Sequence, residues 1–193
     1  MKNSREPVLN AGFRGSHALA QRPQALAALG AIYVEWTRIE ASLAVMLATL
    51  LFGESLSTGD EIAAMEIMEH CTGIAGKTQS LIAVARIRLS ENPALLKRFQ
   101  KSLDAIVDAA RTRNRLVHGR WSIGPEPDTV RHERRIGLNS KNTTYNPSTL
   151  ACILNNLERV YDELHAIFFE EVVPASEDFL SRRIDYFSAI QDR

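Results

Sequence analysis

The chain has 193 residues, of which 45% are hydrophobic and 24% are charged, and its formal net charge is zero. This is the composition of an ordinary globular protein, and the length suits one domain with a single sizeable core. The two cysteines, Cys71 and Cys152, have no neighbouring Cys or His at metal-ligand spacing, which argues against a structural zinc site and fits a reducing, cytoplasmic location.

Neither a signal peptide nor a membrane span is expected. Residues 1–22 lack a long apolar stretch, and the most apolar run, residues 41–52, is too short to cross a bilayer. Charge is unevenly distributed, because residues 111–141 contain eight Lys and Arg against three Asp and Glu, whereas residues 142–193 contain four against nine. The basic middle segment could attract phosphates, or it could simply be a solvated surface.

The spacing of apolar residues predicts an α-helical bundle with one small β insertion, formed as a single domain by residues 23–193. Residues 1–22 are polar and aperiodic, which predicts a flexible N-terminal arm. In chain order, helices are predicted at residues 23–52, 58–89, 93–118 and 147–168 and from Ser176 onward, with a β-hairpin near residues 119–137. Gly73 and Gly76 are candidate breaks within the second of these helices.

The stretch RTRNRLVHGRW, residues 111–121, places polar side chains where the third helix should bury apolar ones. Arg113 continues the apolar row three residues after Ala110, Asn114 flanks the same face, and His118 follows Asn114 by one turn. Buried polar groups are costly unless they have partners. We therefore expect these three side chains to be paired, to lie in a groove or to face another subunit.

Two interpretations of this cluster are open. In the first, Glu40 on the first helix pairs with Arg113 and only fixes the helix register, which leaves Asn114 and His118 without a role. In the second, the three side chains cleave RNA. Imidazole can transfer a proton near neutral pH, guanidinium binds phosphate oxygens in pairs, and an amide can orient either group. The 2′-hydroxyl of the RNA supplies the nucleophile, so we expect no metal and no cofactor.

The sequence RNRLVHG, residues 113–119, resembles the Rx4-6H motif of the HEPN superfamily, in the form with a polar residue after the arginine. HEPN domains are α-helical bundles; they are often RNases, and many act as toxins or in defence against phage. The resemblance implies an all-α, HEPN-like bundle of four to five helices that acts as an endoribonuclease. HEPN RNases are typically homodimers with both motifs in one cleft, and a toxin would have an antitoxin protein as a further partner.

The resemblance implies that Arg113 and His118 are the catalytic residues and that Asn114 orients them. In this hypothesis Glu40, which lies outside the motif, holds Arg113 in place. Residues expected to contact or attract RNA are Arg120, Trp121, Arg131, Arg134 and Arg135, although Trp121 could instead fold onto the helices. His132, in the same basic segment, could contact phosphate, but the favoured expectation is that it is solvated. The alternative function is a non-catalytic, dimeric HEPN-type binding or scaffold module, because the fold alone does not establish activity.

Overall fold

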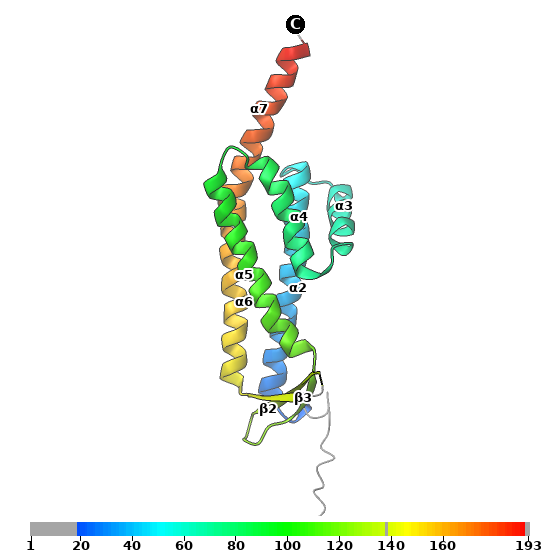
Figure 1. Cartoon of the computed structure of the whole chain (residues 1–193), viewed down its shortest axis with the longest axis vertical. Coiled ribbons are helices and arrows are strands. Elements are labelled where there is room, and N and C mark those ends of the chain that lie inside the picture. Colours follow the sequence, from blue (N-terminus) through cyan, green and yellow to red (C-terminus); the bar gives the residue numbers. More distant parts are fainter. Residues whose placement is uncertain (1–18, 138, 192–193) are drawn as a thin grey trace, which may run out of the picture. The chain divides into compact units, whose positions relative to one another are not determined.

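The computed structural model describes residues 19–137 and 139–191, so most of the predicted N-terminal arm lies outside the described residues. The described chain is mostly helical, with a small antiparallel sheet inserted between two helices (Figure 1). The helices are α2 (Pro23–Phe52), α3 (Thr58–Glu69), α4 (Gly73–Arg88), α5 (Pro93–Val117), α6 (Pro147–Ile167) and α7 (Val173–Gln191), with a π-helical turn, η1 (Phe168–Val172), between the last two. The predicted helical fold with a β insertion is confirmed.

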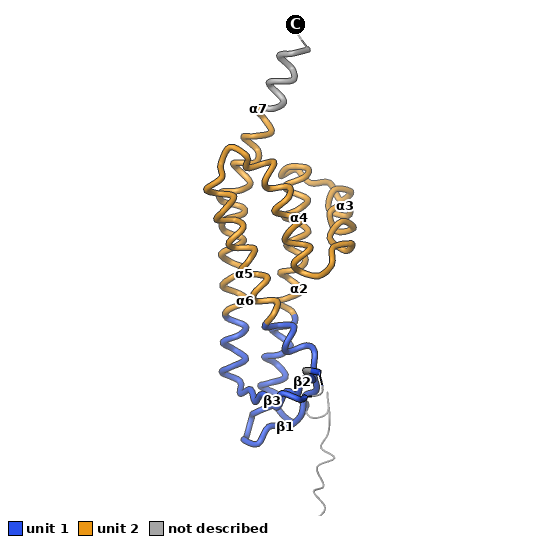
Figure 2. The backbone as a smooth tube through the Cα atoms, in the orientation of Figure 1, with its two compact units in different colours: residues 1–33, 112–155 blue, residues 34–111, 156–193 orange. Residues whose placement is uncertain are grey.

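The chain divides into two compact units (Figure 2). Residues 1–33 and 112–155 form one, which we call the sheet unit, and residues 34–111 and 156–193 form the other, which we call the helical unit. Helices α2, α5 and α6 each contribute residues to both units. This division does not decide whether residues 23–193 fold as a single domain, which stays a prediction.

Large apolar side chains fill the core of the helical unit. Helix α2 buries Trp36, Ile39 and Leu43 at spacings of three and four residues, as an amphipathic helix does. Helix α5 buries Phe99, Leu103 and Ile106 in the same way, and the ring centroids of Phe99 and Phe168 are 5.8 Å apart. The break that separates α3 from α4 falls just before Gly73, which has a φ of +62° that favours glycine, whereas Gly76 lies within α4.

The predicted separate helix from Ser176 is instead the continuation of α6. Helix α7 begins at Val173, directly after η1, and Ser176 is buried. Pro174 cannot donate a backbone hydrogen bond, so one bond is missing from the helix. The helix contains a wider, π-helical turn, η1, which ends two residues before this proline. The proline therefore changes the winding of the helix and does not end it.

The sheet has three strands, β1 (Arg120–Ile123), β2 (Val130–Ile136) and β3 (Asn139–Tyr145), in the order β1-β2-β3. Strands β1 and β2 form the predicted hairpin. The third strand extends beyond it, because Gly137, at a φ of +61°, provides a second reversal of the chain. Between β1 and β2, Thr129 closes the turn by donating its hydroxyl to the Glu126 carbonyl, at 2.8 Å.

Candidate functional site

The end of helix α5 carries the motif residues. Arg113 is half-buried, as expected for a residue that continues the apolar row, and its Nε atom is fully buried. Beyond Arg113 the buried row passes through Leu116, three residues on, while Val117 is 45% exposed. Asn114 and His118 are both exposed. The turn is nevertheless regular, since the His118 backbone N–H donates to the Asn114 carbonyl at 3.1 Å.

Asn114 and Tyr33 contact the Arg113 guanidinium within the sheet unit. Its Nη1 donates to Asn114 Oδ1 at 3.1 Å, and its Cζ lies 5.8 Å from the centre of the Tyr33 ring, within the range of a cation–π contact. Because Asn114 Oδ1 accepts from Arg113, the Asn114 amide N–H₂ is left to donate to another oxygen. The Arg–Asn pair is therefore a cation joined to a donor group at a half-exposed position.

Arg113 also borders a small pocket of about 170 Å³ within the sheet unit. This is smaller than the usual range for drug-sized ligands, roughly 300–1,000 Å³. The pocket is apolar apart from the guanidinium, and it is lined by Leu19, Leu29, Ile32, Tyr33, Arg113, Leu116, Val117 and Trp121. Trp121 and Arg113, which the sequence analysis assigned to RNA, therefore share one pocket.

Gly119 connects the helix to the sheet, and no other residue fits there without a shift. A Cβ atom on Gly119 would lie 2.2 Å from His132 Nε2 and 2.6 Å from the Glu133 carbonyl oxygen. The His132 ring thus lies directly against the backbone that follows His118. The prediction that His132 is solvated is wrong: only 3% of the residue is exposed, because the alternation along β2 turns it inward with Val130.

The environment of His132 favours its neutral form. Burial lowers the pKa of the imidazole, and the charge of Arg134 lowers this pKa further. Within the described residues, His132 Nε2 has no hydrogen-bond partner. The burial of His132 was not predicted from the sequence because its neighbours Arg131 and Glu133 are charged. The available signal was Val130, an apolar residue two positions earlier, which faces the same side of a strand as His132.

Trp121 packs against other rings of the sheet. Its ring centroid lies 4.5 Å from that of His132, its direct cross-strand neighbour, and 5.7 Å from that of Tyr145. Trp121 is half-buried. The expectation that Trp121 stacks on an RNA base stays a prediction, as does the alternative that it folds onto the helices.

The four arginines expected to attract RNA lie on two faces of the sheet. Arg131 and Arg135 are exposed on one face, together with Glu133, which is the cross-strand neighbour of Arg120. Arg134 is half-buried on the opposite face, the face of His132. The sheet therefore does not present the five predicted RNA-contacting residues as one surface.

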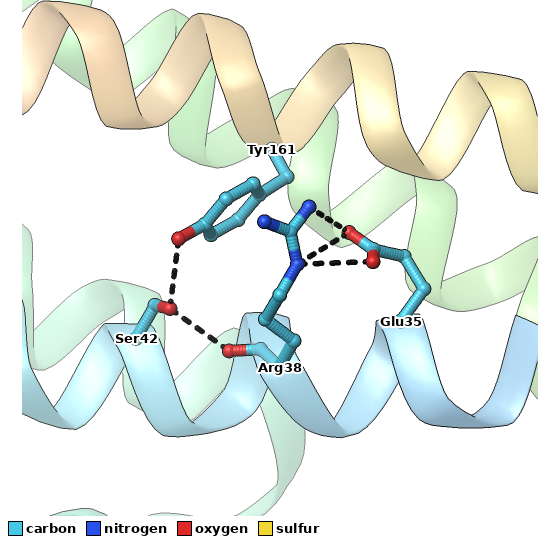
Figure 3. A network of polar contacts seen from close by, with 4 residues as sticks. All are labelled: Glu35, Arg38, Ser42 and Tyr161. Carbon is cyan, nitrogen blue, oxygen red and sulfur yellow. Dashed lines mark hydrogen bonds and ion pairs between the residues drawn. The ribbon is translucent and has the colours of Figure 1, made fainter.

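Glu40 lies in the helical unit, where its Oε1 forms an ion pair with Lys77 Nζ at 3.5 Å. The prediction that Glu40 holds Arg113 in place stays a prediction. Arg38, the arginine of α2, belongs to a network of polar contacts that is drawn in Figure 3. Arg38 Nε donates to both oxygens of Glu35 at 3.0 and 3.1 Å, and the Arg38 guanidinium lies 3.9 Å from the centre of the Tyr161 ring.

The hydrogen bond to Glu35 raises the pKa of Arg38, so the guanidinium stays charged. Ser42 joins the network, with its Oγ 3.1 Å from the Tyr161 hydroxyl and its own O–H directed to the Arg38 carbonyl at 2.9 Å. The i, i+3 spacing of Glu35 and Arg38 was the only sequence signal for this contact. The network fixes α2 against α6 within the helical unit.

Residues 19–137 and 139–191 contain no group of three His, Cys, Asp or Glu side chains close enough together to hold a metal ion. Over the same residues, no helix is long and apolar enough to cross a membrane. Comparisons of the chain with protein-family models, with curated proteins and with solved structures found no match.

Proposed function

We propose that this chain is a metal-independent endoribonuclease whose catalytic residues are Arg113, Asn114 and His118. The observation that carries the proposal is the position of Arg113: its guanidinium is held by Asn114 and Tyr33 at the edge of a pocket, five residues before an exposed histidine on the same helix end. This set supplies a fixed cation, a hydrogen-bond donor and an accessible proton carrier.

The reaction we propose uses the 2′-hydroxyl of the RNA. His118 accepts the proton of this hydroxyl, the oxygen bonds to the adjacent phosphorus, and the bond from phosphorus to the 5′-oxygen breaks. The leaving oxygen takes up a proton, and the products are a 2′,3′-cyclic phosphate and a 5′-hydroxyl end. Arg113 stabilises the charge that builds on the phosphoryl oxygens, and the Asn114 amide donates to one of them.

We further propose that the active form is a homodimer, as the resemblance to HEPN RNases implies. Support comes from apolar side chains exposed in the sheet unit: Tyr33 and Val117, which line one pocket with Arg113, are 58% and 45% exposed, and Leu26 is 43% exposed. Exposed apolar side chains near one another favour a protein–protein contact. In such a dimer, His118 of a second copy is available to protonate the leaving oxygen, and the two motifs form one site.

The test is an RNA cleavage assay with EDTA present, on wild type, His118→Ala and Arg113→Ala. We expect wild type to release 2′,3′-cyclic phosphate ends and each variant to lose at least about 100-fold in rate. His70→Ala and Arg115→Ala are matched controls, because both side chains are exposed and lie outside the motif pair. Equal cleavage by all five proteins would assign the activity to a contaminant.

The second candidate is a non-catalytic dimeric module in which the same cluster only stabilises the subunit contact. The exposed apolar residues Leu26, Tyr33 and Val117 favour it equally. The two functions differ in what His118→Ala changes. A structural cluster predicts a lower melting temperature and a weaker dimer, whereas a catalytic residue predicts lost cleavage with little change in either. If expression of wild type impairs cell growth and expression of His118→Ala does not, a toxin or defence role is supported.

A further inference from the structure

Helix α3 has a capping box at its N-terminus, and few of its residues are buried. Ser57 and Asp60 form a capping box, with the Ser57 N–H donating to Asp60 Oδ2 at 2.9 Å and the Asp60 N–H donating to Ser57 Oγ at 3.3 Å. Only Ala64 and Met68 of this helix are buried, whereas three large apolar residues are exposed: Ile62, Met65 and Ile67. A helix with more apolar surface outside than inside is a candidate contact surface.

One side of α3 borders a groove in the helical unit. The groove has a volume of about 300 Å³, and its apolar lining comes from Ala41, Ala44 and Val45 of α2 and from Met65 and Met68 of α3. Val45 is 41% exposed and Met65 is 53% exposed, so this part of the lining is accessible from solvent, whereas Ala44 and Met68 are buried. Methionine side chains adapt their shape to different apolar partners, which suits a surface that binds a protein segment.

The charged residues of this groove are mainly acidic. Glu40, Glu61 and Glu69 line it together with a single basic residue, Lys77, which pairs with Glu40. Within the described part of the chain, Glu61 and Glu69 form no ion pair. Helix α3 as a whole carries four carboxylates and no Lys or Arg. The groove therefore joins an apolar lining to unpaired negative charge.

We propose that this α2–α3 groove binds a basic amphipathic helix of a partner protein. Apolar residues of that helix at spacings of three and four would contact Val45 and Met65, and its Lys or Arg residues would lie beside Glu61 and Glu69. The same negative charge repels a phosphate backbone, so the occupant is a protein segment and not RNA. The proposal does not depend on the RNA-cleaving function, because the groove lies in the helical unit and shares no residue with the Arg113 pocket.

The first experiment uses a fluorescent synthetic peptide of leucine and lysine, with leucine on one face of a helix. Its control is the same peptide with glutamate in place of lysine. We expect saturable binding of the lysine peptide to wild type at physiological salt, and no binding of the glutamate peptide, with fluorescence anisotropy as the measurement. Failure of the lysine peptide to bind, or equal binding of both peptides, would overturn the proposal.

Charge variants of α3 then locate the binding. Glu69→Lys should weaken binding of the lysine peptide about fivefold, the scale of one exposed ion pair. Glu66→Lys is the matched control, because it makes the same change of charge at an exposed position of the same helix outside the groove. Equal weakening by the two variants would mean that the peptide responds only to the overall charge of α3. That result would overturn the proposal that the peptide binds in the groove.

Apolar variants test the lining in the same way. Met65→Ser should weaken binding about tenfold, because it removes an accessible apolar contact, and Ile62→Ser should leave binding unchanged. Met65 and Ile62 are similarly exposed, at 53% and 55%, so neither substitution removes a buried side chain. A loss of binding in Ile62→Ser as large as that in Met65→Ser would contradict the proposed position of the helix.

Discussion

The two units of this chain obtain their internal packing in different ways. The helical unit buries large apolar side chains, such as Trp36 and Phe99. In the sheet unit, a buried histidine lies against a glycine at the end of α5. Truncation of a close-packed core side chain leaves a cavity that its neighbours fill only in part, whereas a backbone held against a ring has no room for an added methyl group. The two regions should therefore respond differently to small and to large substitutions.

The largest expected effect is in the core of the helical unit. Phe99 is fully buried and lies beside Phe168, so Phe99→Ala removes most of an aromatic side chain and leaves a cavity. We expect the free energy of unfolding to fall by about 3–5 kcal/mol, measured by chemical denaturation. A loss below about 1 kcal/mol would contradict this prediction, because it would mean that neighbouring side chains move to fill the cavity.

A smaller substitution tests the sheet unit. Gly119→Ala adds one methyl group at 2.2 Å from His132 Nε2, so the ring or the Glu133 backbone must shift, and we expect a loss of about 1–3 kcal/mol. Gly30→Ala is the matched control, because a Cβ on this α2 residue meets no atom within 4 Å. The control should gain about 0.5–1 kcal/mol through helix propensity. If both variants gained stability, the contact between Gly119 and His132 would be absent.

Part of the structure of the two units could be predicted from the sequence. The apolar rows of α2 and α5, and the end of α5 before Gly119, follow from side-chain spacing and from one glycine. Strand β3 was missed because its sequence, NSKNTTY, lacks the alternating apolar residues that mark a half-buried strand. The unbroken passage from α6 into α7 was missed because a π turn leaves no mark in the sequence pattern.

The candidate site, too, could be predicted only in part from the sequence. The heptad at residues 113–119 located Arg113, Asn114 and His118, but it gave no sign that Tyr33, eighty residues earlier, lies beside Arg113. Sequence spacing describes one face of one helix. A contact between side chains from different elements depends on how those elements pack, which no single segment encodes.

The smallest expected effect concerns pH. The folded state lowers the pKa of His132, so between this pKa and the unfolded value near 6.5 the unfolded chain binds more protons than the folded one. Stability should therefore fall as the pH drops below about 6.5, and no effect of this group is expected above it. Thermal melts of wild type and His132→Asn from pH 7.5 to 5 should show a smaller decrease in the variant. Identical decreases in both would assign the pH dependence to other groups.

The most direct test of the central claim, that Arg113 and His118 promote attack by a 2′-hydroxyl, uses a DNA oligonucleotide that contains one ribonucleotide. With EDTA present, wild type should cut only at the phosphate 3′ of that ribonucleotide and leave a 2′,3′-cyclic phosphate, and His118→Ala should leave the substrate intact. Cutting at deoxyribonucleotides, or equal cutting by His118→Ala, would contradict the account.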